Sequence, residues 1–433
     1  MADQINYAGE VRLTKCNLIS SAGTKGVDIT NIVYHIEIFE DIFSNSLSGN
    51  IILTETYNLR NQLPLIGEEI LEIEFNTPTF TQKFTKSFYV YRMTDHVIQG
   101  DKKMAYCLHF MSLENVYDLN TKLSRSFLGN THEIATSLFN QYVRIPEVPK
   151  EIYAEESSNK IKFVANFWSP YKCLNYAASR STDMTSFQTP NFLFFESRSG
   201  FNFRSLNSLM KAPTVYSYLY DTKSRRTNTI EDGCSVRDIN QEYHSAFNMI
   251  VDEPFDYITR ELNGVFSHKV IQHNLLNKNV TSHVYNYWND FEQTNHLGVA
   301  PLCSEYVDFN DTGTLYSTKT IYPSMHNNIN DISGEIVSKR ISLLGHPDLH
   351  KIKVVVAGRT DIEVGQVVEF KMAKYGHLTQ ENKNDDMSDK YWSGNYLITN
   401  IKHQVTAKDH QMTLSLSKDA IDQDAFKFGE VLT

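Results

Sequence analysis

The sequence lacks the features that would mark a membrane or secreted protein. No apolar run approaches the roughly 18 residues that a membrane-spanning helix needs, so no membrane insertion is expected. The N-terminus, MADQINYAGE, has neither a basic start nor an apolar core, and it predicts no secretion signal. Without secretion, the N-x-[ST] matches at Asn279 and Asn310 predict no glycosylation.

Cysteine and positive charge are also scarce. The five cysteines are odd in number and have no close pairs, which indicates reduced, buried thiols and not a disulfide framework or a zinc site; they are Cys16, Cys107, Cys173, Cys234 and Cys303. The 41 Lys and Arg against 51 Asp and Glu give a net charge of −10. This balance excludes the basic footprint of a sequence-specific nucleic-acid-binding protein, but it permits an acidic surface past which DNA slides.

Aromatic residues are plentiful, with 24 Tyr and 25 Phe against 19 Gly and 11 Pro. This composition favours sheets with aromatic cores over disorder. The 433 residues suffice for about three domains of the usual size.

Two similar hairpins stand about three hundred residues apart: KSFYVYRMTDHVIQGDKKMAYCLHF (86–110) and GNYLITNIKHQVTAKDHQMTLSLS (394–417). In each, a tyrosine (Tyr89, Tyr396) is followed seven positions later by a histidine (His96, His403). A polar turn with Asp and Lys follows, and then a second strand of alternating polarity that begins at a methionine. Alternation with period two is typical of half-buried strands.

The segments before the two hairpins also correspond. GEEILEIEF (67–75) matches GQVVEF (365–370), and each follows an apolar strand, GNIILTE or KIKVVVAG. The order of apolar strand, glycine, strand and hairpin is therefore repeated. An accidental match is the alternative, and we favour duplicated β-domains.

Between the repeats the periodicity is helical. Asn130 as N-cap with Glu133 predicts a helix that carries Ile134, Leu138 and Tyr142 on one face. Ser169 as cap and Pro170 at the first helical position predict a second helix, with a buried side made of Leu174, Ala177 and Ala178. NFLFFESRSGFNFRS (191–205) predicts two strands that turn at Ser199 and Gly200.

These patterns predict a mainly β fold with an α+β middle domain, in which two related antiparallel β-barrels flank inserted domains. The predicted parts are a first barrel (1–115), an α+β domain (116–210), a second barrel (211–258 and 335–420), an insertion (259–334) and a C-terminal arm (421–433). The second barrel is expected to resume around Ile336. Within the insertion, NKNVTSHVYNYWNDF (277–291) fits a strand or a short helix.

No common catalytic motif is present: the sequence has no G-x-S-x-G, P-loop, dinucleotide glycine fingerprint, H-E-x-x-H or C-x-x-C. HPDLH (346–350) would place His346 and His350 four apart on a helix, as in a metal site, but Gly345 and Pro347 favour a turn. We therefore predict no catalytic, cofactor-binding or metal-binding residue, no cofactor and no enzymatic activity.

Two acidic pairs, Glu68 with Glu69 and Asp385 with Asp386, could serve as glycosidase carboxylates. Their places, at a strand entrance and in the polar loop 377–392, favour solvated charges instead. For His96 and His403 we predict a structural contact at a strand end.

Several segments together resemble the baseplate hub proteins of contractile-tailed bacteriophages, which are related to the base of the spikes of contractile injection systems. They are IEIFEDIFSNSLSGNIILTET, LPLIGEEILEIEF, NFWSPYKCLNYAASRS, FLFFESRSGFNF, GRTDIEVGQVVEF and GNYLITNIKHQV. The likeness spans nearly the whole chain, and it consists of hydrophobic patterning with a few turn glycines.

The resemblance implies a homotrimer in which two related tube barrels per chain alternate around an axis. Six positions would then continue the hexameric tail tube, and the remaining domains would form a cup that grips the trimeric central spike. The implied partners are the spike, the tail tube protein or a tube-initiator ring, other baseplate subunits, and phage DNA that passes through the lumen without sequence-specific binding. The implied location is the tail baseplate of a virion assembled in the host bacterial cytoplasm.

Two other functions remain open from the sequence alone. The chain could be a tail-associated hydrolase, such as a cell-wall lysin, whose catalytic part is the middle domain. It could also be a glycan- or receptor-binding tail protein that uses the aromatic-rich stretch 280–325.

Overall fold

The structure is a computed structural model. It describes residues 5–20, 26–56, 59, 63, 65–78, 80–99, 103–146, 148–220, 230–231, 234–235, 239–252, 256–274, 278–302, 333–373 and 388–422. Among these residues no helix is long and apolar enough to cross a membrane.

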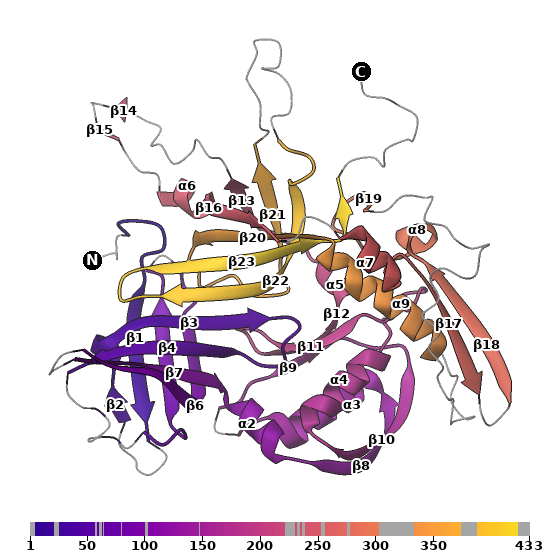
Figure 1. Cartoon of the computed structure of the whole chain (residues 1–433), viewed down its shortest axis with the longest axis horizontal. Coiled ribbons are helices and arrows are strands. Elements are labelled where there is room, and N and C mark those ends of the chain that lie inside the picture. The colour runs from indigo at the N-terminus through magenta and orange to yellow at the C-terminus, as the bar shows by residue number, and fades with distance from the viewer. Residues whose placement is uncertain are drawn as a thin grey trace.

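One large, curled, mainly antiparallel sheet of 13 strands organises the described chain (Figure 1). Seven strands from the N-terminal part make its first half: β1 (Arg12–Ile19), β2 (Gly26–Asp28), β3 (Val33–Asp41), β4 (Ser48–Glu55), β5 (Ile70–Asn76), β6 (Phe84–Gln99) and β7 (Lys103–Ser112). Six later strands make its second half: β13 (Thr214–Tyr220), β16 (Ala246–Val251), β20 (His350–Ala357), β21 (Val367–Met372), β22 (Gly394–Val405) and β23 (His410–Lys418).

The two halves pair their strands in the same order. The first half runs β3-β4-β7-β6-β5-β1, with β2 added at the outer edge, and the second half runs β16-β20-β23-β22-β21-β13. This agrees with the repeated order of strand, strand and hairpin that the sequence predicts. The last strand differs, because β1 lies antiparallel to β5 whereas β13 lies parallel to β21.

The bulges in the two halves also coincide. The register of β3 on β4 shifts at Tyr34, and that of β16 on β20 shifts at Phe247. The register of β6 on β7 shifts at Tyr91, and that of β22 on β23 shifts at Thr399. A bulge adds one unpaired residue at a fixed place, so these shared bulges fix which residues of the two halves correspond.

This correspondence corrects one detail of the sequence comparison. Tyr396 lies three residues before the Thr399 bulge, as Phe88 lies three residues before the Tyr91 bulge, so the counterpart of Tyr396 is Phe88 and not Tyr89. The equal spacing to the histidines arises because β6 has a second irregularity, between Thr94 and Val97, that β22 lacks.

An α+β region follows the first half. Its elements are α2 (Leu113–Asn120), β8 (Leu123–Asn130), α3 (Thr131–Leu138), the π-helical turn η2 (Phe139–Val143), β9 (Ile152–Ala154), β10 (Lys160–Trp168), α4 (Pro170–Arg180), β11 (Phe192–Glu196), β12 (Phe201–Ser205) and α5 (Leu206–Met210). The predicted capping box of Asn130 and Glu133 is confirmed. Ser169 accepts a hydrogen bond from the Lys172 amide, with Pro170 at the helix start, as predicted. The β11–β12 hairpin is also confirmed, whereas α2 was not predicted.

The segments around the second half add further elements. They are β14 (Ile230–Glu231), β15 (Cys234–Ser235), α6 (Ile239–His244), α7 (Tyr257–Leu262), β17 (Ser267–Asn274), β18 (Asn279–Asn286), α8 (Tyr287–Asp290), η3 (Phe291–Gln293), β19 (Ala300–Pro301), α9 (Ser333–Gly345), η5 (His346–Asp348) and β24 (Ala420–Ile421), besides η1 (Thr30–Ile32) near the N-terminus. The stretch 277–291 thus contains both a strand and a short helix. The second barrel was predicted to resume around Ile336; helix α9 occupies that position, and the next strand of the sheet, β20, begins at His350.

Among the described residues, three large apolar cores lie beneath these elements, besides a small cluster of Ala8, Tyr243 and Ala357. One fills the first half, one fills the second half, and one lies within the α+β region. The second-half core also takes in Phe195 and Leu209 from the α+β region. Cys16, Cys107 and Cys173 are free and buried, as predicted, and burial raises the pKa of the Cys16 thiol to about 12.

Candidate assembly interface

Strand β22 joins the two halves of the sheet. One edge of β22 pairs with β23, and its other edge is divided between two strands. Gly394 to Leu397 pair with β21, and Asn400 to Val405 pair with Ile36 to Asp41 of β3. The division falls at the Thr399 bulge, where the Thr399 carbonyl accepts a hydrogen bond from the Ile42 amide (3.0 Å). We call the β22–β3 contact the internal seam.

A buried polar chain runs along the internal seam. Nε2 of His403 lies 3.2 Å from a Glu40 carboxylate oxygen, and its Nδ1 lies 3.1 Å from Nε2 of His410. The other Glu40 oxygen accepts a hydrogen bond from the Arg198 amide (3.2 Å). Burial, with a smaller effect from His403, holds the pKa of His410 well below its usual value. Glu40 thereby links both halves to the β11–β12 turn.

A second buried cluster joins the first half to the α+β region. Nζ of Lys150 lies 2.7 Å from a carboxylate oxygen of Glu114 and 2.7 Å from one of Glu196. The second Glu196 oxygen accepts hydrogen bonds from the Ser112 hydroxyl (2.6 Å) and from the Leu47 amide (3.0 Å). Burial alone would lower the pKa of Lys150, but the two carboxylates outweigh it and the pKa is raised. Desolvation raises the pKa of Glu114.

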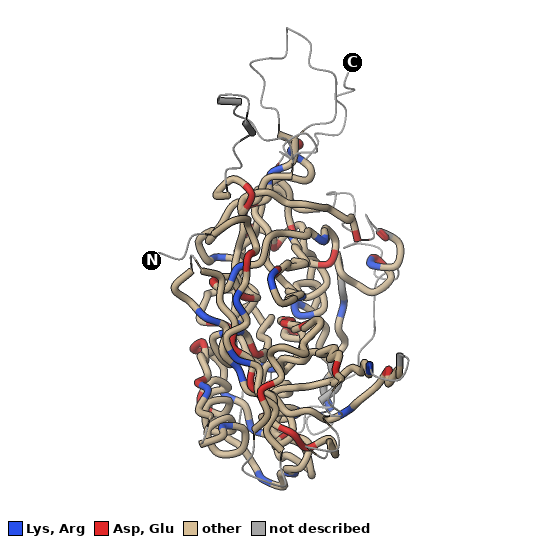
Figure 2. The backbone as a smooth tube through the Cα atoms, turned by 90° about the vertical axis from the view of Figure 1, so that its left-hand side faces the viewer, with Lys and Arg blue, Asp and Glu red and all other residues tan. Residues whose placement is uncertain are grey.

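The outer surface of the first half carries both charge signs. Lys15 pairs with Glu72 (2.7 Å) and Lys83 with Glu74 (3.2 Å) on neighbouring strands. Figure 2, which views this side of the molecule, shows Lys and Arg interspersed with Asp and Glu. Such mixed, partly exposed pairs are typical of a solvated surface.

The residues considered as catalytic or metal sites take structural places. Both Glu69 oxygens accept hydrogen bonds from the Gly67 amide, and one also accepts from the Ile66 amide (2.6 Å), so this carboxylate closes the glycine turn before β5. Glu68 is exposed, as expected for a solvated charge, whereas the same prediction is wrong for Glu69, which is fully buried. Asp385, Asp386 and Asn310 lie outside the described residues, as does Cys303, and Asn279 lies in β18.

The two histidines of HPDLH are buried with separate partners. His346 donates from Nδ1 to the Ser342 carbonyl (2.8 Å) and stacks on Tyr287. His350 donates from Nε2 to the Tyr391 carbonyl (3.0 Å). Burial lowers the pKa of His346 to about 4 and that of His350 to about 3. Across the described residues, no group of three or more His, Cys, Asp or Glu could hold a metal ion.

The repeated histidines differ in their surroundings. His403 is buried in the internal seam, whereas His96 is exposed near the end of β6 with its ring close to that of Tyr106. A structural strand contact therefore describes His403. Sequence reasoning did not find its partner Glu40, which is 363 residues away.

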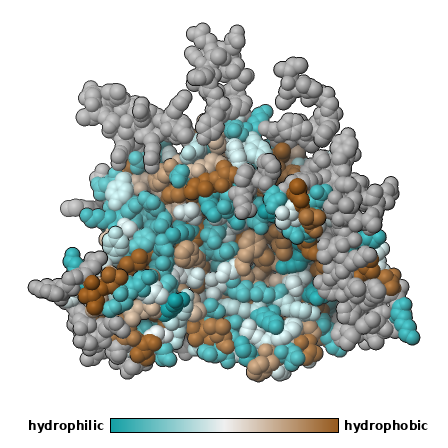
Figure 3. Space-filling view, in the orientation of Figure 1, coloured by the Kyte–Doolittle hydropathy of each residue, from teal (hydrophilic) through white to brown (hydrophobic). Residues whose placement is uncertain are grey.

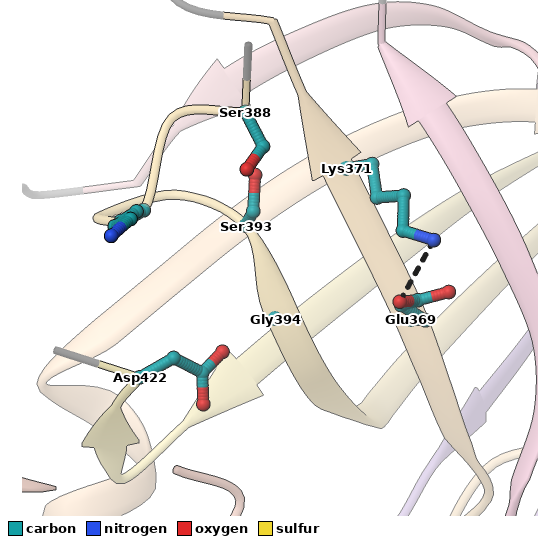
Figure 4. Close-up of a pocket in the computed structure, with 7 residues that line it drawn as sticks. Glu369, Lys371, Ser388, Ser393, Gly394 and Asp422 are labelled. Atoms are coloured by element: carbon teal, nitrogen blue, oxygen red, sulfur yellow. Dashed lines mark ion pairs between the residues drawn. The ribbon is translucent and has the colours of Figure 1, made fainter. Parts of the chain in front are cut away.

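A polar pocket of about 300 Å³ opens where β21 and β22 meet the end of the described chain (Figure 4). Its described lining comprises Glu369, Lys371, Ser388, Lys390, Ser393, Gly394 and Asp422. Lys371 is paired with Glu369 (3.0 Å), and Asp422 approaches Gly394 from the other side. The lining offers hydrogen-bonding and charged groups without a histidine or cysteine nucleophile.

The architecture is similar to that of solved tail proteins. A tail protein from Neisseria meningitidis MC58 matches with a TM-score of 0.53 at 12% identity, over 96% of this chain and 97% of that chain. The 43 kDa tail protein of prophage MuSo2 from Shewanella oneidensis matches with a TM-score of 0.54 at 9% identity, over 94% and 99%. The chain has the fold of phage tail proteins. No family model and no curated protein matches the sequence.

Both matched tail proteins are covered over nearly their whole length, so the likeness includes both halves of the sheet and the region between them. At such low identity the likeness concerns the tail-protein fold alone.

Proposed function

We propose that this chain is a structural hub of a contractile phage tail, and that three copies form a ring between the tail tube and the central spike. The observation that carries the proposal is the equivalence of the two sheet halves, with the same pairing order and the same bulge positions. Three chains with two equivalent halves present six equivalent positions, which allows a trimer to match a hexameric tube. The fold shared with tail proteins supports this assignment.

In this proposal the two halves are two related β-barrel domains, formed by 1–115 and by 211–258 with 335–420. The α+β region 116–210 and the insertion 259–334 form the cup that receives the spike. The ring contacts the tail tube protein or a tube-initiator ring, and other baseplate subunits surround it. The role is structural, without enzymatic activity or a cofactor.

The proposed channel carries phage DNA without sequence-specific binding. Many Lys or Arg contacts would each release counterions on binding phosphate and would hold the DNA in place. The net charge of −10 permits a lumen of the opposite character. A lumen dominated by Lys and Arg in the assembled ring would contradict this part of the proposal.

Light scattering and negative-stain imaging of the purified chain test the assembly. We expect a mass of three protomers and ring-shaped particles with a central hole. A strictly monomeric chain, even when mixed with its spike partner, would contradict the hub. Incubation with peptidoglycan separates the hub from a cell-wall lysin, because the hub should release no fragments.

A further inference from the structure

Among the open strand edges of the described sheet, two lie on β6 and β16. On β6, pairing with β5 ends at Tyr89, followed by one hydrogen bond from the Val90 amide to the Glu69 carbonyl. The rest of β6 pairs with β7 along one edge only. On β16, one edge pairs with β20, and the other meets β13 only at the bridge between Leu219 and Ser245.

Both open edges carry exposed apolar side chains. Val97 and Ile98 of β6 are 50% and 65% exposed, and Ile250 and Val251 of β16 are 53% and 37% exposed. In Figure 3, apolar side chains gather beside β20 and again over the strands of the first half. Exposed apolar strand edges pair readily with other strands, so soluble proteins usually protect or cover them.

The internal seam indicates which kind of strand the open edges of β6 and β16 can pair with. In the second half β22 is the counterpart of β6, and in the first half β3 is the counterpart of β16. The edge of β22 beyond its bulge pairs with β3. A second seam of the same kind would therefore join two edges. One is the edge of β6 beyond the equivalent bulge, and the other is the outer edge of β16.

The shared bulge positions allow the strand register of the internal seam to be applied to the proposed second seam. Lys402 follows the Thr399 bulge by three residues, as Thr94 follows the Tyr91 bulge, so Lys402 corresponds to Thr94. Beyond the second irregularity of β6, Gln404 corresponds to Val97. Counting from Tyr34 and Phe247, Glu37 corresponds to Ile250.

In the internal seam Gln404 faces Glu37 and Val405 faces Ile36. The transferred register therefore places Val97 opposite Ile250 and Ile98 opposite Met249.

We propose that β6 of one copy pairs antiparallel with β16 of a second copy of this chain, in the register that places Val97 opposite Ile250. This proposal rests on the proposed ring, for which it supplies the contact between protomers. Each copy offers one β6 edge and one β16 edge, so the contact is head-to-tail and can repeat around a ring. The polar Gln404–Glu37 pair of the internal seam corresponds to the apolar Val97–Ile250 pair of the second seam. This contact buries the exposed side chains of both edges.

Cysteine cross-linking of the full chain tests the pairing. Directly opposite residues of an antiparallel pair have Cβ atoms about 4.5–5.5 Å apart, close enough for a disulfide after small adjustments. Oxidation of the double variant Val97→Cys with Ile250→Cys should therefore give disulfide-linked dimers and trimers in a denaturing gel. The parent chain and each single variant, which retain the native cysteines, should give only background.

The register has its own control. Val97→Cys with Val251→Cys places the two thiols on opposite faces of the joined sheet, because a one-residue slip reverses the side-chain direction. This pair should cross-link at least tenfold less than the matched pair. Equal cross-linking by the two pairs would overturn the proposed register.

A charge variant tests the same contact without cysteine. Val97→Glu should convert the oligomer to monomers in light scattering, because it places a carboxylate against Ile250. The control Val164→Glu alters a valine that is 63% exposed in the α+β region and should leave the mass unchanged.

The results of these experiments distinguish failure of the β6–β16 contact from failure of the proposed hub. If the wild-type chain forms a trimer, but the matched pair does not cross-link and Val97→Glu leaves the mass unchanged, the β6–β16 contact is overturned while the hub stands. If the wild-type chain stays a monomer even when mixed with its spike partner, and the matched pair does not cross-link, both are overturned.

Discussion

The two halves of the sheet share a strand order but contact the α+β region in different ways. The second half contacts the α+β region through apolar packing, since Phe195 and Leu209 belong to the second-half core. The first half contacts the same region through buried charges, with Lys150 held between Glu114 and Glu196. The strand order thus defines the repeated fold, and the contacts distinguish the roles of the two copies.

The physical consequences of the two contacts differ. Apolar packing is non-directional, and its stabilisation grows with the area buried. A buried ion triad pays a large desolvation cost and contributes little net stability, but removal of one partner leaves a buried charge uncompensated. The charged contact should therefore be the more sensitive to single substitutions.

The largest effect is expected for Lys150→Met, which leaves Glu114 and Glu196 buried without their cation. Breaking a buried pair in this way costs about 3–5 kcal/mol of unfolding free energy. Urea denaturation measures it. The matched control is Lys15→Met, which removes the exposed Lys15–Glu72 pair and should cost less than about 1 kcal/mol. Equal losses for the two variants would contradict the role given to the buried charges.

Acid should act through buried histidines associated with the second half. The pKa of His346 is lowered to about 4, so the folded chain stays neutral there while the unfolded chain takes up a proton as the pH falls below about 6.5. The stability from this group is fully present above pH 6.5 and is lost as the pH falls towards 4. The loss amounts to about 3 kcal/mol at 1.36 kcal/mol per pKa unit.

The variant His346→Asn isolates this loss. Asparagine keeps a donor for the Ser342 carbonyl but does not titrate. Carboxyl groups with raised pKa, such as Asp118, act in the opposite direction and are common to both proteins. We expect the stability difference between wild type and variant, measured by urea denaturation, to shrink as the pH falls from 7 to 4. A constant difference would contradict the assignment.

At the position of Gly49 the two halves of the sheet have different residues. Its counterpart in the second half is Ile352, because each lies opposite the corresponding residue of the hairpin, Phe110 or Leu416. A Cβ atom on Gly49 would clash with the Glu37 carbonyl and lie 2.5 Å from the Phe110 ring. Gly49→Ala should therefore cost about 1–3 kcal/mol by overpacking.

The matched change in the second half removes volume instead. Ile352→Val should cost about 0.5–1.5 kcal/mol, since it deletes one buried methylene. Thermal and urea denaturation compare the two variants. A neutral Gly49→Ala would show that both the Glu37 carbonyl and the Phe110 ring can move away, contrary to this close packing.

Local patterns allowed much of this fold to be predicted from the sequence. Period-two alternation predicted the hairpins, and Asn130 with Glu133 predicted the start of α3. The internal seam could not be predicted, because β3 and β22 are far apart in sequence and strand pairing at that distance leaves no local signal. Helix α2 was missed because it is short and its two buried polar residues, Glu114 and Asp118, find their partners, Lys150 and the Tyr171 amide, only later in the chain.

The smallest effect concerns the Lys402–Glu37 ion pair of the internal seam, which has no counterpart in the proposed second seam. Lys402 pairs with Glu37 across the seam (2.6 Å), and the counterpart of Lys402 in the first half is Thr94. Lys402→Thr therefore gives the second half the residue of the first. Because Lys402 is partly exposed, the loss should be about 0.2–1 kcal/mol at low salt and smaller at high salt. Urea denaturation at two salt concentrations measures it. A loss above about 2 kcal/mol, or one independent of salt, would show that the pair is a structural requirement of the seam and that the two seams are built differently.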